Sequence, residues 1–500
     1  MRILPKITPP TRGRRWRTMQ LPLLARPILM RKLSLLDLGF FIAETSASPK
    51  HVGGLLVFKR PANTRDTFAR DLYADLLTFN EVAAPFSLVI NFALTAMPTW
   101  RTADAVDLHQ HLFYHRLPQR TKKSSKPKTD QQVLFDFVAK LHEPMLDRTR
   151  PLWEVHVIDG LADGRFALYQ KMHHAYADGV TMVRWTEEGL SRTPRTKTIT
   201  PIWTIKQSAY AGLRKKRTEA LMASSWTSLG GAARRVLGIT RLATMLALES
   251  VKLTKNAIAL PFVTTAKTPL TGQVSSGRQF TTSGISMARM EAIRKRTRST
   301  LNHIALTCVD GALRRYLRDQ GVELDRPIII QMPVNLRREG EKTAGNKIGI
   351  ILVELSPPTD DPYVRLRNIG FSLRNVRTMI DNVAPEAIES YTIITGLIAQ
   401  IAELLKLSNS MPPMGNTLVS NVAGPKQHLY MRGAKLEEMH PISTLPPSNL
   451  LNVTLFSYAG DLFFGLIASE SLPNLPRLAH YVEEAFTELE QSVGEMKTVG

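Results

Sequence analysis

Cysteine is nearly absent from this chain, which has one, Cys308, among 500 residues. A single thiol excludes a disulfide framework, a zinc site built from cysteines and a Cys-X-X-Cys redox centre. Long apolar runs are also missing, because charged residues interrupt the two longest candidates, 236–253 and 394–407. A membrane-spanning helix needs roughly 18 apolar residues, so we expect none. Arg26 and Pro27 interrupt the apolar patch near the amino terminus, which argues against a secretory signal, and we expect a cytoplasmic protein.

Acidic residues are few relative to basic ones. The 65 lysines and arginines exceed the 43 aspartates and glutamates, which gives a formal net charge of +22. This balance favours an anionic partner such as nucleic acid, an anionic membrane surface or a phosphorylated substrate. Aromatic residues are only 7% of the chain and are not interleaved with the basic ones, and no known nucleic-acid-binding motif is present. We therefore expect no nucleic-acid partner.

The basic residues concentrate in two segments. Residues 1–32 carry nine lysines and arginines and no acid, and prolines break any long helix there. This basic arm is either a solvated tail or a segment attracted to anionic lipid headgroups. Between Arg192 and Lys267 there are fourteen basic residues and two acids, with apolar residues at roughly helical spacing. We expect 191–270 to be a basic helical linker that lies either on the protein surface or in a membrane interface.

The remaining chain mixes strand and helix patterns in two regions. In 33–190, apolar runs bounded by turn residues predict strands at 52–58, 153–158 and 166–172, and apolar residues at helical spacing predict helices at 66–77, 131–141 and 180–190. In 271–500 the same criteria predict a helix at 301–317, strands at 328–332 and 348–353, and a hairpin formed by 453–458 and 462–467. This pattern predicts an α/β protein with two lobes joined by the linker.

One short motif stands out from the rest of the sequence. It runs from His173 and His174 through Ala-Tyr-Ala to Asp178 and Gly179, after a predicted strand and before a predicted helix. Three interpretations are open: structural histidines at a strand end, metal ligands together with Asp178, or a general base. Adjacent strand residues point to opposite faces, and no His-Glu-X-X-His motif accompanies them, so we expect no metal site. An imidazole with its ordinary pKa of about 6.5 is well suited to accept a proton at neutral pH.

Other catalytic motifs are absent from the sequence. There is no Gly-X-Ser-X-Gly elbow, no phosphate-binding loop of the Gly-X4-Gly-Lys-Ser/Thr type and no Gly-X-Gly-X-X-Gly fingerprint. Cys308 lies within a predicted helix among apolar residues, which favours a core thiol over a nucleophile.

The histidine motif resembles the His-His-X-X-X-Asp-Gly signature of CoA-dependent acyltransferases with the chloramphenicol acetyltransferase-like fold, a superfamily that also contains peptide-synthetase condensation domains. Further segments, in the same order along the chain, resemble one family within it, the bacterial wax ester synthase/diacylglycerol acyltransferases. These segments are 50–57 (KHVGGLLV), 107–118, 144–160 (PMLDRTRPLWEVHVIDG), 267–280, 333–337 (PVNLR), 345–346, 420–425 (SNVAGP) and 452–466. The resemblance extends from about residue 33 to the carboxyl terminus.

The resemblance implies a fold and a reaction. The fold would be α/β with two chloramphenicol acetyltransferase-like lobes, 33–190 and 271–500, each a mixed sheet flanked by helices. The reaction would move a long-chain acyl group from acyl-CoA, a co-substrate rather than a bound cofactor, to a fatty alcohol or to diacylglycerol, without an acyl-enzyme. A peripheral place on the inner membrane or on lipid inclusions would follow. The alternative is a condensation-type acyltransferase that uses a carrier-protein thioester.

The resemblance also implies roles within the motif. His174 would be the general base, and His173 would shape the turn. Asp178 would orient the loop, and Gly179 would keep the passage open and permit a tight backbone.

Candidates for binding the substrate oxyanion lie in the second lobe. Asn302, Ser420 and Asn421 are these candidates. The alternatives are a helix cap for Asn302 and a turn for 420–425. The family usually has Asn-Asp where this chain has Asn302-His303, so only Asn302 transfers from that pair.

Overall fold

The computed structural model of this chain describes residues 31–33, 35–91, 98–118, 129–206, 259, 261–336, 348–383 and 385–495. The expected basic arm at 1–32 lies outside the described residues except for its last two. Most of the expected helical linker at 191–270 also lies outside them. The described parts of that linker contain one 3-10 turn, Ile202–Thr204.

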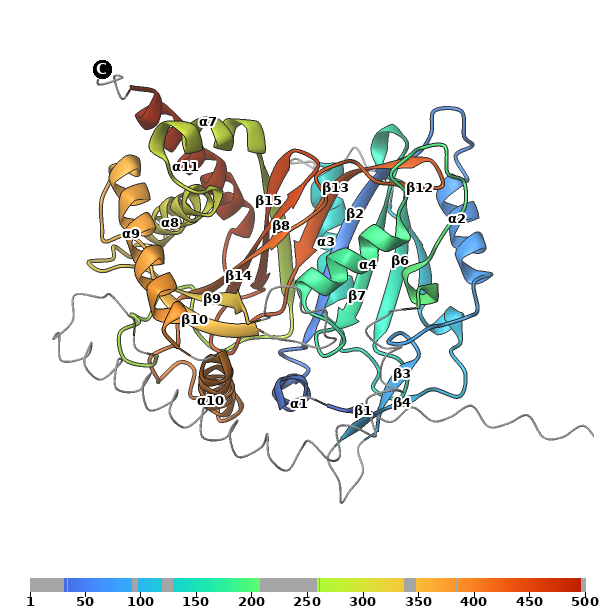
Figure 1. The fold of residues 1–500 in the computed structure, drawn as a ribbon, viewed down its shortest axis with the longest axis horizontal. Coiled ribbons are helices and arrows are strands. Elements are labelled where there is room, and N and C mark those ends of the chain that lie inside the picture. The colour runs from blue at the N-terminus through green and yellow to red at the C-terminus, as the bar shows by residue number, and fades with distance from the viewer. Residues whose placement is uncertain are drawn as a thin grey trace, which may run out of the picture.

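Two six-stranded mixed sheets stand side by side and form the frame of the molecule (Figure 1). The first has the order β12-β13-β2-β7-β6-β5, in which β5 and β6 are parallel and the other pairs are antiparallel. Its strands are β2 (His51–Lys59), β5 (Leu112–Arg116), β6 (Trp153–Asp159), β7 (Arg165–His173), β12 (Tyr430–Met431) and β13 (Ala434–Ile442). The strands predicted at 52–58, 153–158 and 166–172 are confirmed, because their apolar runs are buried in this sheet.

The second sheet has the order β10-β9-β11-β14-β15-β8. Its strands are β8 (Arg278–Ser286), β9 (Ile329–Asn335), β10 (Ile348–Glu354), β11 (Thr417–Ala423), β14 (Leu451–Tyr458) and β15 (Asp461–Ser469). Strand β11 is parallel to both β9 and β14, and the other pairs are antiparallel. The predicted hairpin is confirmed as β14 and β15, which pair from Leu451 with Ala468 to Tyr458 with Asp461.

The sheets do not divide the chain as the two expected lobes do. Strands β12 and β13 lie within 271–500, yet β13 pairs with β2 and extends the first sheet. The range 271–500 therefore supplies strands to both lobes. Where a strand inserts depends on the neighbours it meets in three dimensions, which its local pattern does not encode.

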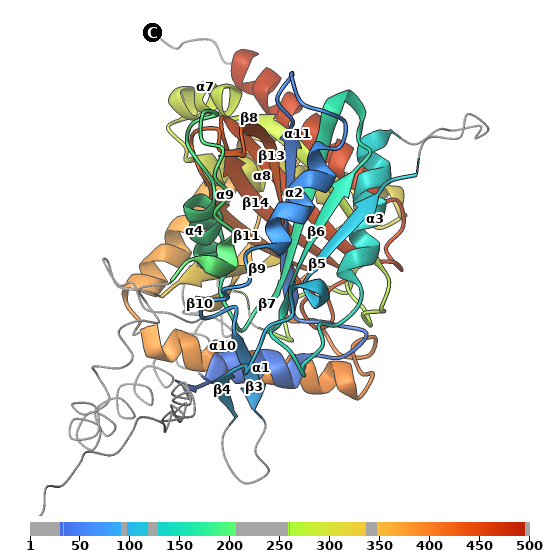
Figure 2. The same ribbon diagram turned by 90° about the vertical axis from the view of Figure 1, so that its right-hand side faces the viewer.

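Helices cover both sheets, and those predicted in each lobe are present (Figures 1 and 2). The helices of the first lobe are α1 (Leu35–Ala43), α2 (Phe68–Leu77), α3 (Asp130–His142) and α4 (Gly179–Gly189). Those of the second are α7 (Met287–Thr297), α8 (Leu301–Asp319), α9 (Pro362–Asp381), α10 (Pro385–Leu404) and α11 (Leu475–Glu495). A small third sheet is formed by β1 (Arg31–Lys32), β4 (Thr99–Thr102) and β3 (Leu88–Asn91). Within the described residues, no helix combines the length and apolarity needed to cross a membrane.

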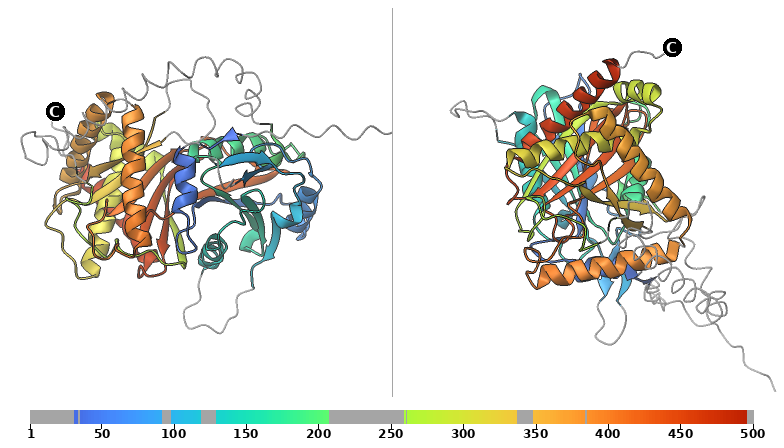
Figure 3. Two further views of the ribbon diagram at one scale, coloured as in Figure 1. Left: turned by 90° about the horizontal axis from the view of Figure 1, so that it is seen from below. Right: turned by 90° about the vertical axis from the view of Figure 1, so that its left-hand side faces the viewer.

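The largest hydrophobic cluster of the described residues extends across both lobes. Helix α3 of the first lobe packs on β8 of the second, and β13 contacts β14 and β15. Leu55 and Leu134 of the first lobe belong to the same buried cluster as Val309 and Leu455 of the second. Helices α1 and α10 contact each other at one end of this seam (Figure 3). The seam is thus a packed interface on which a site between the lobes can be held rigidly.

Candidate active site

The histidine motif occupies the junction of a strand, a turn and a helix. Strand β7 ends at His173, which pairs with His51 on β2. The ladder continues one bond further, because the amide of His174 donates to the carbonyl of Lys50 at 2.8 Å. The chain then turns, with the amide of Tyr176 donating to the carbonyl of His173 at 3.0 Å, and α4 begins at Gly179. The sheet therefore fixes both histidines.

His173 points away from the cavity into the protein interior, where it contacts an aromatic ring and a carboxylate. Its ring stacks on Phe41 with 4.3 Å between centroids. Its Nδ1 accepts a hydrogen bond from the Ala175 amide at 3.1 Å, and its Nε2 lies 3.6 Å from Glu44 Oε2. Burial alone would raise the pKa of Glu44, but His173, the Lys50 amide and Arg148 outweigh it and lower that pKa to about 2. The arrangement holds His173 in one orientation that supports the turn.

His174 faces a cavity, on the opposite side from its neighbour. Its ring stacks on Phe40 with 4.3 Å between centroids and lines a cavity of about 360 Å³ between the lobes. Burial is the largest influence and lowers the pKa of His174 from its ordinary value, against the charges of Asp178 and Asp37. The imidazole is therefore neutral at pH 7, the form that accepts a proton.

Asp178 and Gly179 start helix α4 beside this imidazole. The Oδ1 of Asp178 accepts hydrogen bonds from the Thr181 amide at 3.0 Å and from the Thr181 hydroxyl at 2.7 Å, so Asp178 is the N-cap of α4. Gly179 does not have the positive φ that a tight backbone would require. Its need for a small side chain is steric instead, because an added Cβ would lie 3.2 Å from Val422.

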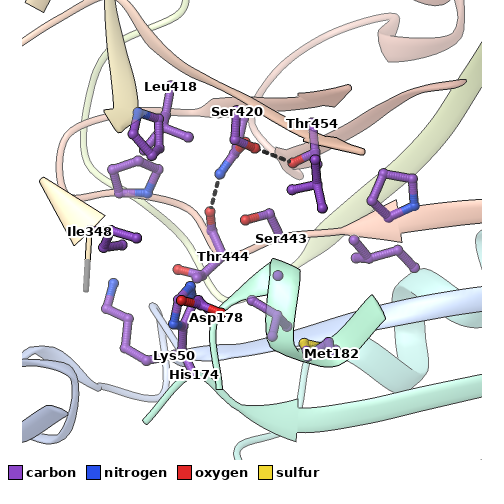
Figure 4. A pocket seen from close by; sticks show the side chains of 18 of the residues that line it. Lys50, His174, Asp178, Met182, Ile348, Leu418, Ser420, Ser443, Thr444 and Thr454 are labelled. Carbon is purple, nitrogen blue, oxygen red and sulfur yellow. Dashed lines mark hydrogen bonds between the residues drawn. The ribbon is translucent and has the colours of Figure 1, made fainter. Parts of the chain in front are cut away.

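The second lobe supplies the opposite wall of the cavity. Ser420 and Asn421 line it from β11, and Ser420 donates to the Thr454 hydroxyl at 3.0 Å (Figure 4). The alternative of a turn at 420–425 is wrong for 420–423, which are part of the strand. Figure 4 shows His174 and Asp178 on one side of the pocket and Ser420 and Thr454 on the other.

Asn302 lies behind that wall, next to a residue that lines the cavity. Its Oδ1 accepts a hydrogen bond from Asn421 Nδ2 at 3.2 Å, but Asn302 is not among the described residues that line the cavity. The helix-cap alternative is wrong, because the side chain that caps α8 belongs to Thr300. Asn302 therefore reaches the cavity only through Asn421.

Lys50 is a cavity residue that the sequence did not single out. Because its carbonyl pairs with the His174 amide, the two side chains leave the sheet on the same face. Its Nζ donates to Ser48 Oγ at 2.6 Å and to the Leu445 carbonyl at 3.2 Å. Burial and then the charge of Arg278 lower the pKa of Lys50 to about 8, against the charges of Glu403 and Glu44. The register that places Lys50 opposite His174 joins two strands far apart in the chain, so the local sequence carries no signal for it.

Gln400 of α10 is a second residue that the sequence did not indicate. It lines the cavity and is only 2% exposed, and neither atom of its amide has a hydrogen-bond partner within the described part of the chain. A buried amide of this kind favours a ligand that brings its own polar group. Most of the remaining lining is apolar, including Val52, Ile348 and Leu418.

Cys308, which the sequence predicts to be a core thiol rather than a nucleophile, does not line the cavity. Cys308 is buried in the core of α8, and burial raises the pKa of its thiol to about 12. It is a core thiol, as predicted, and is not among the described residues that line the cavity.

Two family models match this chain. One, described as the wax ester synthase/diacylglycerol acyltransferase catalytic domain, matches residues 33–305. The other, described as the WS/DGAT C-terminal domain, matches residues 344–490. Together they cover both lobes.

Individual relatives agree with the family models. A putative diacylglycerol O-acyltransferase of Mycobacterium bovis is 30% identical over 463 residues, which covers 92% of this chain and 98% of the relative. The O-acyltransferase WSD of Acinetobacter baylyi is 31% identical over 463 residues, with 91% and 96% covered.

Solved structures give the same result for the fold. The wax ester synthase/diacylglycerol acyltransferase from Marinobacter aquaeolei VT8 superposes with a TM-score of 0.70 at 27% identity, covering 93% of this chain and 99% of that one. A starter condensation domain of rhizomide synthetase superposes with a TM-score of 0.55 at 11% identity, covering 93% and 95%, and so shares the fold alone. The chain belongs to the wax ester synthase/diacylglycerol acyltransferase family of O-acyltransferases.

Proposed function

We propose that the protein transfers a long-chain acyl group from acyl-CoA to the hydroxyl of a fatty alcohol or of diacylglycerol, with His174 as the general base. The observation that carries this proposal is the position of His174, a neutral imidazole on the wall of an apolar cavity between the lobes. The family to which the chain belongs supports the reaction class.

The chemistry balances with a single proton carrier. His174 takes the proton of the acceptor hydroxyl as its oxygen attacks the thioester carbonyl carbon. The tetrahedral adduct then breaks its carbon–sulfur bond, and the imidazolium returns the proton to the leaving CoA sulfur. An ester and free CoA result, and no acyl-enzyme is formed. General-base assistance of this kind contributes about 10²–10⁴ in rate.

The tetrahedral oxyanion requires hydrogen-bond donors in the cavity wall. Among the donors of the described lining are the amide of Asn421, the hydroxyl of Ser420 and the ammonium of Lys50. Lys50 is the one Lys or Arg among those described lining residues, and it lies on the same face of the sheet as His174. We assign Lys50 and Asn421 to the oxyanion. The single hydroxyl hydrogen of Ser420 is already donated to Thr454, whereas the Asn421 amide and the Lys50 ammonium each have one more N–H than the bonds they make to Asn302 and to Ser48 and Leu445.

The apolar lining of the cavity accounts for long-chain substrates. Each buried methylene contributes about 0.8 kcal/mol, so a palmitoyl chain gains up to roughly 12 kcal/mol on transfer from water. Electrostatic attraction of CoA phosphates to basic residues is smaller for each group and is screened by salt. We propose that chain burial sets selectivity and that the enzyme works at the periphery of the inner membrane or of cytoplasmic lipid inclusions, where such chains are stored.

A carrier-protein thioester remains the alternative donor, because condensation domains share this fold. No residue of the described cavity favours it specifically. The test incubates the purified protein with palmitoyl-CoA and either hexadecanol or dioleoylglycerol, followed by product chromatography. Wax ester or triacylglycerol is expected, and acyl transfer only from a phosphopantetheine carrier would contradict the proposal.

A further inference from the structure

Ile388, near the start of helix α10, is buried, but from residue 394 to its end the helix carries its large apolar side chains on its solvent side. Five of these side chains recur at helical spacing and form a stripe along the helix. All five are exposed, and 55% of the surface of Ile401 is accessible to solvent. We call this stripe the α10 face; it consists of Ile394, Leu397, Ile398, Ile401 and Leu404. In this part of the helix, the fully buried side chains on the protein side are small or polar instead: Thr395, Ala399, Gln400, Ala402 and Glu403, with Thr392 one turn before them. A helix on a water-exposed surface normally buries its apolar face and exposes its polar one, and this part of α10 does the reverse.

Hydrogen bonds on the inner side hold the helix in this rotation. Thr392 Oγ1 accepts from the Ile350 amide at 2.8 Å, near the amino-terminal half of the helix. At the other end, the Glu403 carboxylate accepts from the amides of Val274 at 2.9 Å and Ser448 at 3.0 Å. The outward position of the apolar stripe is therefore built into the fold.

The exposed apolar surface of the described chain is concentrated here. Seven of its twelve exposed large hydrophobic side chains lie within 394–407. Ile42 adds to them from α1, which contacts α10 (Figure 3). No charged residue occurs from Ser390 to Ala402. A contiguous apolar surface of this kind marks an interaction site.

The α10 face is continuous with the cavity. Gly396, Leu397 and Gln400 line the cavity from α10, and Gly39 and Phe40 line it from α1. Leu397 belongs to both surfaces, since it lines the cavity and is 40% exposed. The cavity therefore reaches the surface where the two helices meet, beside the apolar stripe.

We propose that the α10 face docks on a lipid surface and sets the cavity entrance against the hydrocarbon that holds the acceptor. This inference rests on the proposed function, because it is the water-insoluble acceptor that needs such a route. Lipid is the occupant that fits. The stripe is purely aliphatic over more than two turns, whereas a protein partner would require a polar rim with hydrogen bonds. The net charge of +22 adds attraction to anionic headgroups.

The test measures flotation of the full chain with vesicles of phosphatidylethanolamine, phosphatidylglycerol and dioleoylglycerol. The variant is Ile398→Glu/Ile401→Glu, at two positions outside the cavity lining. The matched control is Val364→Glu/Phe371→Glu on α9, which adds the same two charges at side chains 38% and 54% exposed, close to the 42% and 55% of Ile398 and Ile401. We expect the double variant to lose vesicle affinity by about tenfold or more, and the control to float as the wild type does.

The other outcomes each contradict the proposal. A double variant that floats like the wild type, or a wild type that does not float, removes the docking role. A lowered Tm with unchanged flotation shows that another part of the chain covers the α10 face. A change from dimer to monomer with unchanged flotation shows a self-interface. Turnover of palmitoyl-CoA with dioleoylglycerol in detergent micelles is measured separately: the double variant should keep it, and its absence from the wild type would refute the proposed function without affecting the flotation result.

Discussion

Two adjacent imidazoles have opposite surroundings in this protein. His173 is fully buried between Phe41 and Glu44, whereas His174 faces the cavity and stacks on Phe40. Alternation along β7 produces this difference, because consecutive strand residues leave the sheet on opposite sides. The division of roles between a positioning histidine and a base therefore follows from backbone geometry.

Lys50 predicts an alkaline limit to activity. Turnover should rise with pH as His174 loses its proton, because the pKa of His174 lies below the ordinary 6.5. Turnover should fall again above about pH 8, because the Lys50 ammonium then loses its proton and can no longer stabilise the oxyanion. Lys50→Met should lower the plateau about 10²-fold and abolish the alkaline limb, as expected when an oxyanion donor is lost. Lys50→Arg should keep much of the plateau and move the limb upward, because a guanidinium stays charged.

The measurement is kcat against pH for the three proteins. Glu44, Glu403 and Arg278 are the charged groups whose fields act on Lys50, and they are the same in every variant. An unchanged alkaline limb in Lys50→Met would show that another group sets it. A lower Tm with an unchanged profile would show that Lys50 only holds Ser48 and Leu445 together.

Gln400 predicts discrimination between acceptors. A buried amide without a partner is unfavourable by about 1–3 kcal/mol, and the ester oxygens of diacylglycerol can relieve this, whereas a fatty alcohol has no such oxygens. Gln400→Leu should therefore reduce the preference for dioleoylglycerol over hexadecanol about tenfold. The ratio of kcat/KM for the two acceptors checks it. Thr395→Val, buried on the same helix but away from the cavity lining, is the control that should leave the ratio unchanged.

At the scale of elements, the junction between β7 and α4 depends on one cap. Asp178→Ala removes the acceptor for the Thr181 amide and should lower the free energy of unfolding by about 1 kcal/mol, whereas Asp178→Asn should retain most of it because Asn caps equally well. Urea denaturation followed by circular dichroism measures both. Equal stability of Asp178→Ala and the wild type would mean that the cap does not hold the loop.

Elements were predicted from the sequence where local pattern decides them. The apolar run of β2, the hairpin of β14 and β15, and the apolar stripe of α8 are each determined by neighbouring residues. The insertion of β13 beside β2 was not predicted, because it depends on a contact between segments far apart in the chain. The rotation of α10 was not predicted either, since hydrogen bonds of Thr392 and Glu403 to other segments override its apolar pattern.

In the candidate site, too, residues that are close together in the sequence could be predicted and those brought together by the fold could not. The motif from His173 to Gly179 could be recognised because its residues are contiguous. Ser420 and Asn421 were reached only through resemblance, since β11 is brought to the motif by the packing of the two lobes. Lys50 and Gln400 carried no strong signal, because a Lys before a strand and a Gln in a helix are usually exposed.

At the scale of the whole molecule, the shared core fixes an apolar cavity between the lobes, and its lining predicts chain-length selectivity. Burial of each methylene of the acyl chain contributes up to about 0.8 kcal/mol of binding free energy. The kcat/KM for palmitoyl-CoA should therefore exceed that for acetyl-CoA by at least about 100-fold. Initial rates with donors of increasing chain length check this. Equal efficiency with the two donors would contradict burial of the acyl chain.

The central claim is that one imidazole between the lobes moves the proton. The most direct measurement is turnover of palmitoyl-CoA with dioleoylglycerol by His174→Ala, compared with the wild type and with His173→Ala at matched amounts of folded protein. The account predicts that His174→Ala keeps the wild-type Tm and loses about 10²–10⁴ in kcat, and that His173→Ala loses less. A folded His174→Ala protein with near-wild-type turnover would contradict it.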